Sequence, residues 1–312
     1  MTGVLILLAG STLVGLYGQR PLLWLADRQV DPTTLLTGWV LSAIGFVISV
    51  VAIIGLLAAP AERHGSTGVF HLAGGCWAAL SSGELPGWRE ALAVLSITGV
   101  VAILSRIGWA MAVRIRCHRE RSPHLARLRL LAAGVPSGEP LWVGDHRPMA
   151  MSIGGRPGVI VMSDALRDHL TPAEVAATLE HERAHLRGRH HALVAIIETL
   201  AAALPVIPLL RAAPSAVKDL VELAADAQAA RRCGQAAVRE ALSRLTGQPM
   251  PAVGLAMAGR LTHARLLRLA TASFESSRMV RTAGCAAIAV AALALPGTTG
   301  WLVLNAIDCV IA

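Results

Sequence analysis

Long uncharged apolar segments alternate with polar, arginine-rich segments along this chain. Four apolar segments are long enough to be transmembrane helices, at about residues 2–19, 35–59, 91–113 and 282–307. A helix of about 20 apolar residues crosses the ~30 Å hydrocarbon core of a bilayer. Arg106 interrupts the third segment about two turns from its basic end, and we interpret it as an arginine whose side chain extends to the membrane surface. The pattern predicts a mainly α membrane protein with about four transmembrane helices.

The positive charges predict how these segments are oriented. The densest cluster of arginines directly follows the third apolar segment and contains Arg114, Arg116, Arg119, Arg121, Arg127 and Arg129. By the positive-inside rule this cluster lies in the cytoplasm. Counting spans from it in both directions places the N- and C-termini outside the cell. The polar region between the third and the last span is then cytoplasmic.

This polar region has the pattern of a small α+β domain. The runs EPLWVG, RPMAMSI and PGVIVMS are short and β-prone, and glycine and proline separate them. A helix is predicted to begin next, with Thr171 as its N-cap, Pro172 in the first helical position and Glu174 completing a capping box.

Three further segments of the region are predicted to be helical. Residues Ala192–Leu210 are apolar but contain Pro205 and Pro208, and we expect a buried, surface-bound or re-entrant helix broken at the prolines. Residues Ser215–Arg232 form a charged amphipathic helix. Residues Gly259–Arg281 form another, whose arginine-rich face we expect to lie along the cytoplasmic membrane surface.

Composition supports the membrane assignment and excludes some functions. Apolar residues make up 54% of the chain and charged residues 15%, and the net charge is +8. The positive charges cluster beside apolar segments and no groove-reading motif accompanies them, so we expect no direct nucleic-acid binding. None of the five cysteines forms a C-x-x-C pair, which argues against a disulfide framework or a thiolate zinc site.

The candidate chemistry lies in LEHERAHLRGRHH, within the predicted helix that follows Thr171. His181, Glu182 and His185 form an H-E-x-x-H pattern. Residues four apart share one face of a helix, so both imidazoles can reach one metal ion. The pattern predicts zinc (Zn²⁺) bound by His181 and His185, with Glu182 as general base of a metallopeptidase.

A catalytic zinc needs a third protein ligand, and two residues compete for this position. His191 completes the longer pattern H-E-x-x-H-x-x-G-x-x-H, which is typical of secreted metzincins. Glu222 lies in E-x-x-x-D, where Asp226 could hydrogen-bond a ligand imidazole. Because the domain is predicted to be cytoplasmic, we favour Glu222 and interpret His190 and His191 as part of a solvated helix face.

The chain resembles the membrane metallopeptidases of the beta-lactam sensor-transducer (BlaR/MecR antirepressor) family. The runs PGVIVMSDAL, TPAEVAATLEHERAH and VELAAD carry the resemblance over about residues 114–235, together with the order of the spans. It is similar, more distantly, to the HtpX and CAAX-processing endopeptidases. The resemblance implies a zinc site formed by His181, His185 and Glu222, with Glu182 as general base and Asp226 supporting a ligand. The chain ends directly after its last predicted span, so we expect neither a penicillin-binding sensor domain nor acylation by beta-lactams.

These observations predict three regions and one function. Residues 1–113 form an N-terminal membrane region, residues 114–281 a cytoplasmic zincin-like α+β metallopeptidase domain, and residues 282–312 a C-terminal transmembrane helix. We expect a membrane-embedded zinc endopeptidase that cleaves a protein substrate, with a cytoplasmic transcriptional repressor as the implied partner. The alternatives are a quality-control protease of HtpX type and a non-catalytic membrane signalling module. The sequence does not reveal the oligomeric state.

Overall fold

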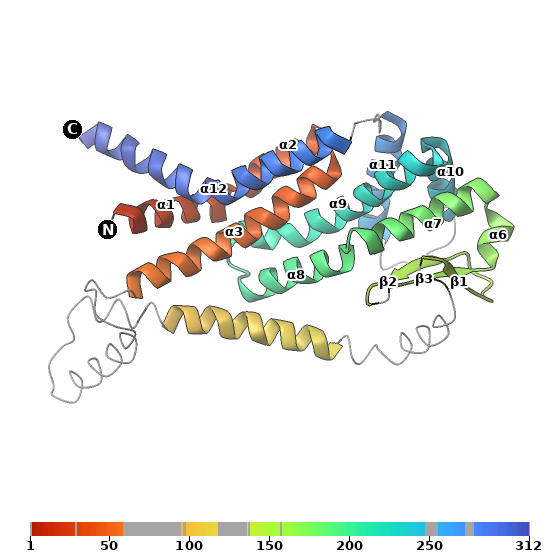
Figure 1. Ribbon diagram of the computed structural model, residues 1–312, viewed down its shortest axis with the longest axis horizontal. Helices are drawn as coiled ribbons and strands as arrows, with labels where there is room; N and C mark the ends of the chain where they lie inside the picture. The colour runs from red at the N-terminus through yellow and green to blue at the C-terminus, as the bar shows by residue number, and fades with distance from the viewer. Residues whose placement is uncertain are drawn as a thin grey trace.

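The computed structural model describes residues 2–28, 30–58, 95, 98–117, 136, 138–156, 158–246, 255–271 and 278–311. Within these ranges the protein is mostly helical and contains one small sheet (Figure 1). Residues 60–90 and the arginines of the cluster that follow Cys117, namely Arg119, Arg121, Arg127 and Arg129, lie outside the described residues.

Four helices pack lengthwise at the end of the molecule that carries both termini (Figure 1). They are α1 (Thr2–Tyr17), α2 (Gln19–Asp27), α3 (Pro32–Ala58) and α12 (Arg278–Ile311). Among the described residues, three helices are long and apolar enough to cross a membrane: Pro32–Ile54, Thr98–Cys117 and Thr282–Leu302. They correspond to the second, third and fourth predicted spans. The first predicted span corresponds to α1, which has only 16 residues, so the count of four spans stays a prediction.

Helices α1 and α12 approach each other closely because two glycines lie where they cross. A Cβ atom on Gly10 would lie 1.5 Å from the carbonyl oxygen of Pro296, and one on Gly300 would lie 1.7 Å from that of Ile6. Small residues at such crossings let two helix backbones pack directly against each other. Helix α12 continues as a helix through Pro296.

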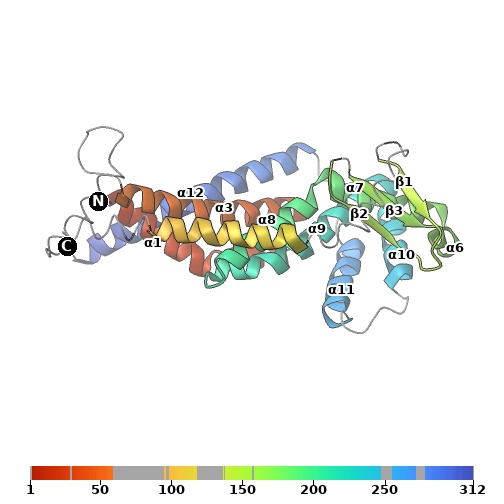
Figure 2. The same cartoon turned by 90° about the horizontal axis from the view of Figure 1, so that it is seen from below.

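Helices α8 (His190–Ala203) and α9 (Pro208–Cys233) form a helical hairpin that packs beside α3 (Figures 1 and 2). The chain turns between Ala203 and Pro208, which is the break that the prolines predicted. Helix α9 begins at Pro208, about two turns earlier than the amphipathic pattern from Ser215 indicated, and proline is tolerated at this first helical position. The hairpin shares one apolar core with α1, α2 and α3, in which Trp39 and Leu35 of α3 and Leu209 of α9 are completely buried.

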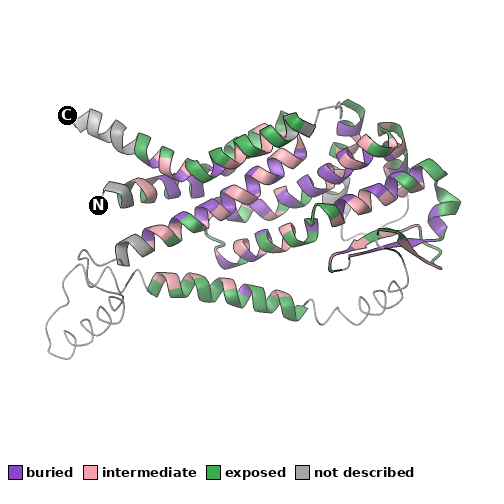
Figure 3. Ribbon diagram, in the orientation of Figure 1, coloured by how far each residue is buried: buried purple, intermediate pink, exposed green. Residues whose placement is uncertain are grey.

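The helix Thr98–Cys117, yellow in Figures 1 and 2, is attached to this hairpin by two arginines. Arg106 donates a hydrogen bond from Nε to the carbonyl oxygen of Ala203 at 2.7 Å. Arg114 pairs with Glu198, which also pairs with Lys218 of α9 at 2.5 Å. Arg106, an exposed residue, thus contacts the C-terminal end of α8, and its extension to the membrane surface stays a prediction. Most of the remaining surface of this helix is exposed (Figure 3).

A three-stranded sheet lies at the other end of the molecule, with β1 (Pro140–Val143), β2 (Ala150–Ile153) and β3 (Val159–Ser163) in the order β1-β3-β2. Strand β3 is parallel to β1 and antiparallel to β2, so β2 is an edge strand. The three β-prone runs of the sequence are thus confirmed as strands. The short helix α6 (Ala165–His169) follows the sheet and leads to α7.

Helix α7 (Pro172–Arg187) begins as predicted, with Thr171 and Glu174 forming both hydrogen bonds of a capping box. It packs against the sheet through Val175, Leu179 and Leu186. Glu180 fixes α7 to α9, because its carboxylate accepts a hydrogen bond from Arg232 of α9 at 3.0 Å. The same carboxylate accepts from Arg183 and Arg187 of α7 at 2.8 and 2.9 Å. Helices α10 (Gln235–Thr246) and α11 (Leu255–Thr271) cover the remaining side of α7 and α9.

Candidate metal centre

Three metal-binding side chains from two helices converge beside the small sheet. His181 and His185 lie one turn apart on α7, and Glu222 lies on α9. Their ligand atoms all lie within 4.8 Å of one another, and they are the one such group among the residues that the structure describes. The structure therefore brings together the two histidines and the carboxylate that the sequence pattern singled out.

The distances within this group suit a tetrahedral zinc ion. The Nε2 atoms of His181 and His185 are 3.1 Å apart; Oε2 of Glu222 lies 3.5 Å from Nε2 of His181, and Oε1 lies 3.5 Å from Nε2 of His185. Ligands at zinc bond lengths of about 2.0–2.1 Å and tetrahedral angles are separated by about 3.3 Å. Two imidazoles and one carboxylate are also a common donor set of catalytic zinc. The residues therefore fit this metal.

The second ring nitrogen of each histidine also has a partner. His181 Nδ1 lies 2.9 Å from a carboxylate oxygen of Asp226, one turn beyond Glu222 on α9. His185 Nδ1 lies 3.0 Å from Nδ1 of His190 in the first turn of α8. Both rings are thus held so that Nε2 faces the shared centre.

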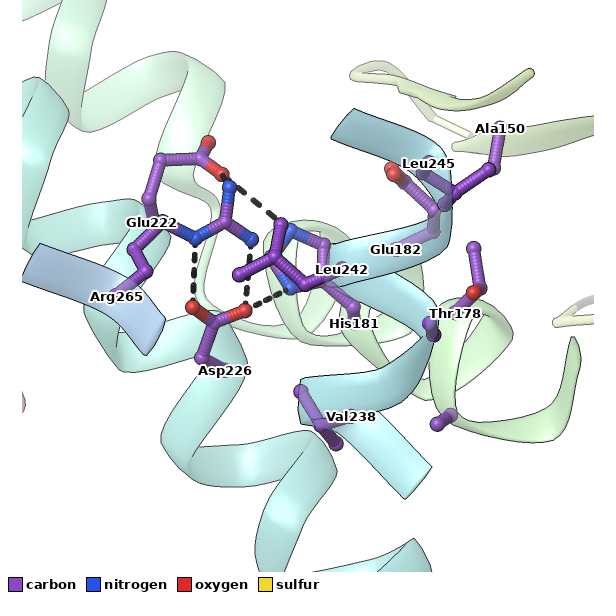
Figure 4. Close-up of a pocket in the computed structure, with 12 residues that line it drawn as sticks. Ala150, Thr178, His181, Glu182, Glu222, Asp226, Val238, Leu242, Leu245 and Arg265 are labelled. Carbon is purple, nitrogen blue, oxygen red and sulfur yellow. Dashed lines mark hydrogen bonds and ion pairs between the residues drawn. The ribbon is translucent and has the colours of Figure 1, made fainter. Parts of the chain in front are cut away.

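The side chain of Arg265 of α11 also lies in the site, next to Glu222 and Asp226 (Figure 4). Its guanidinium donates to both oxygens of Asp226, at 2.7 and 2.8 Å, and lies 3.3 Å from a Glu222 oxygen. Sequence reasoning placed Arg265 and Arg268 on a membrane-facing helix surface, and this was wrong for both residues. Arg268 is buried and donates from Nη2 to the Val30 carbonyl oxygen. The spacing of arginines along the sequence does not reveal which of their side chains are buried in the folded protein.

Opposing charges determine the ionisation of the site. Burial lowers the pKa of His181, but its hydrogen bonds to Asp226 and Glu222 raise it to about 9. Burial lowers the pKa of His185 to about 3, with the neighbouring His181 acting in the same direction. Burial raises the pKa of Glu222, but the hydrogen bond and charge of His181 and the charge of Arg265 outweigh it and lower the pKa to about 2. The pKa of Asp226 is also lowered, so Glu222 and Asp226 are both ionised and give the site the negative charge that a cation needs.

The two histidines that follow α7 differ in position. His190 is buried, and the interpretation of this residue as part of a solvated face was wrong. His191 is exposed, and its Nε2 lies 3.2 Å from the hydroxyl of Ser152 on β2. Its ring centroid is 6.2 Å from that of His185, and it is not part of the group of converging donors. The geometry favours Glu222 over His191 as the third donor.

A cavity of about 220 Å³ opens beside these residues. Glu182 lines it together with His181 and Glu222, and Figure 4 shows the Glu182 side chain directed toward Ala150 and Leu245. The remaining wall is largely apolar and is formed by Ala150, Ala177, Val238, Ala241, Leu242 and Leu245. A carboxylate next to the donor group and an apolar wall beyond it are suited to binding and hydrolysing a peptide.

Residues 132–225 match the model of the protein family described as Peptidase family M48. The match supports a metallopeptidase domain of this family. The matched residues include the strands, α7 with His181, Glu182 and His185, and Glu222 of α9. No curated protein and no solved structure significantly matches the chain. The match does not assign the chain to the beta-lactam sensor-transducers or to HtpX in particular.

The apolar helices are consistent with membrane association.

Proposed function

We propose that this chain is a membrane-embedded zinc endopeptidase that cleaves a protein substrate at the cytoplasmic face of the membrane. The observation that carries the proposal is the convergence of His181, His185 and Glu222 next to Glu182 in one cavity. The match to a peptidase family over the same residues supports it. In this proposal residues 114–281 are the protease domain, and residues 1–113 and 282–312 hold it at the membrane.

His181, His185 and Glu222 would hold the zinc ion, and Asp226 would support His181. When bound, zinc supplies Lewis-acid chemistry, which activates water near neutral pH and polarises a carbonyl group. Glu182 takes a proton from the attacking water and gives it to the amine nitrogen that leaves when the peptide bond breaks. The buried Arg265 keeps Asp226 and Glu222 in place as anions.

Strand β2 is suited to hold an extended substrate. It is the edge strand of the sheet on the side away from β1, and its first residue, Ala150, lines the cavity with Glu182. An added strand would gain main-chain hydrogen bonds without a demand for particular side chains. The apolar wall of α10, with Val238, Ala241 and Leu242, would receive an apolar side chain next to the cleaved bond.

The test is the substitution Glu182→Gln in the full-length protein. The variant should bind zinc as the unchanged protein does, because Glu182 is not one of the converging donors. Its cleavage rate should fall about 10²–10⁴-fold, the usual contribution of a general base. Zinc content and cleavage of a denatured casein-type substrate are measured side by side. Glu240→Gln, an exposed residue of α10, is the matched control and should retain activity. Unchanged proteolysis by the Glu182 variant would refute the proposal.

The substrate of this protease is a transcriptional repressor in our proposal. A comparison of cellular proteomes carrying the unchanged protein and Glu182→Gln distinguishes this role from quality control. A regulatory protease should leave one cytoplasmic protein uncut in the variant and change the expression of its target genes. Accumulation of many damaged membrane proteins would instead assign the chain to quality control.

A further inference from the structure

His190 is a buried polar residue to which the proposed reaction assigns no role. It lies at the start of α8, and only 6% of its surface is exposed. Its ring meets that of His185 edge to face, with 4.9 Å between the centroids, and the two Nδ1 atoms are 3.0 Å apart. A buried imidazole at hydrogen-bond distance from the outer nitrogen of a donor residue is placed to orient that residue.

The backbone around His190 is shaped to admit this ring. Helix α7 ends at Gly188, and Arg189 adopts a left-handed conformation with φ 49° before α8 begins. A Cβ atom on Gly188 would lie 2.3 Å from Nε2 of His190 and 2.5 Å from its Cδ2. Any side chain at position 188 would therefore displace the His190 ring, and the tight corner brings His190 back over the end of α7.

The geometry points to His190 as a positioning residue for His185, an inference that rests on the proposed zinc site. His185 turns Nε2 toward His181 and Glu222, so its Nδ1 carries the proton and donates to Nδ1 of His190. His190 then carries its own proton on Nε2. His181 is held by a carboxylate and His185 by a neutral imidazole, so the two rings of the site are supported by groups of different charge.

The experiment measures zinc affinity of the full-length protein by competition with a chromophoric chelator, apart from any proteolysis. His190→Ala should weaken zinc binding about 10–100-fold, as loss of such a supporting group does. His190→Asn keeps a hydrogen-bond acceptor and should recover much of this loss. Gly188→Ala should resemble His190→Ala, because it displaces the same ring. Thermal unfolding of each metal-free variant shows whether it is folded.

Two control variants separate orientation from general damage. His191→Ala removes the neighbouring exposed histidine and should leave zinc affinity unchanged. Gly144→Ala adds a methyl group where nothing lies within 4 Å and should also be neutral. The visible spectrum of the Co²⁺-substituted protein reports the ligand set, and it should keep its intensity in His190→Ala.

The outcomes distinguish this inference from the proposed function. If the unchanged protein binds no zinc, the proposed function fails and the role of His190 fails with it. If the unchanged protein binds zinc and His190→Ala binds it equally well, only the inference is overturned. A cobalt spectrum that shows the loss of a ligand in His190→Ala would also overturn it, because His190 would then bind the metal itself.

Discussion

Arg265 joins the acidic residues of the metal centre to a helix that is distant in the sequence. Its side chain is 15% exposed and its partner Asp226 is 4% exposed, so the pair is largely removed from water. Burial lowers the pKa of Arg265, but the hydrogen bonds and charge of Asp226 outweigh it and raise the pKa. Without this arginine, Asp226 and Glu222, one helical turn apart, would have His181 as their shared cationic partner.

Arg265→Met should therefore destabilise the metal-free protein more than the zinc-loaded one. Removing one partner of a buried pair typically costs about 3–5 kcal/mol, because the other charge is left without compensation. Bound zinc supplies positive charge at Glu222 and should restore part of the loss. Thermal unfolding in detergent, with zinc and with a chelator, measures the difference. Arg239→Met, at an exposed position on α10, is the control. An equal loss in both states would contradict this account.

At the residue scale, spacing alone indicated part of the site. The interval of four residues placed His181 and His185 on one face, and E-x-x-x-D indicated Glu222 and Asp226. The assignment of these residues as ligands and general base stays a prediction. Arg265 could not be found in this way, because it comes 39 residues after Asp226 on a separate helix whose pattern is that of a membrane surface. His190 was missed because its burial depends on the left-handed turn at Arg189.

Among the helices, the crossing of α1 and α12 depends most directly on particular residues. Gly300→Ala should separate the two helices, because its methyl group would lie 1.7 Å from the Ile6 carbonyl oxygen. Gly297→Ala, on the same helix, meets nothing within 4 Å and should be neutral or stabilise α12 by up to about 1 kcal/mol through helix propensity. The two unfolding temperatures in detergent test this. Equal effects of the two substitutions would show that the crossing does not need Gly300.

Elements with local signals were the most predictable. The capping box at Thr171 and Glu174 marked the start of α7, and the β-prone runs marked all three strands. The prolines marked the break between α8 and α9. The sequence could not show that this hairpin packs against α3, because the apolar residues that form this shared core would be equally suited to lipid. It also could not place Arg106 and Arg114, whose partners lie more than 80 residues away.

Across the whole molecule, both termini lie at one end and the metal centre at the other (Figure 1). If α3 and α12 cross the bilayer, the termini and the metal centre face opposite sides of it. We therefore predict that alkaline phosphatase, which is active only outside the cytoplasm, is active when fused to either terminus. Ser243→Cys, exposed on α10, should react with an impermeant maleimide only after cells are opened, in a variant without the natural cysteines. Inactive phosphatase at one terminus would contradict this topology.

The general architecture followed from the sequence more readily than the number of spans did. The long apolar segments and the short β-prone runs indicated a mostly helical protein with apolar helices and a small sheet, as the structure shows. The run at residues 2–19 is uniformly apolar, yet α1 ends at Tyr17 and a separate helix, α2, begins at Gln19. Its apolar pattern did not reveal this break, which lies at Gly18.

The close pairing of α1 and α12 also determines the order in which the molecule can be completed. On the ribosome, α1 is made before every other described helix, and α12 is made after them. The residues from β1 to Arg265, which supply the metal centre, leave the ribosome earlier than α12 does. The glycine surface of α1 therefore stays without α12 until that helix has been made. Such distant pairings form slowly and leave a surface exposed in the meantime. The group of converging metal donors can thus assemble while the pairing of α1 with α12 is still incomplete.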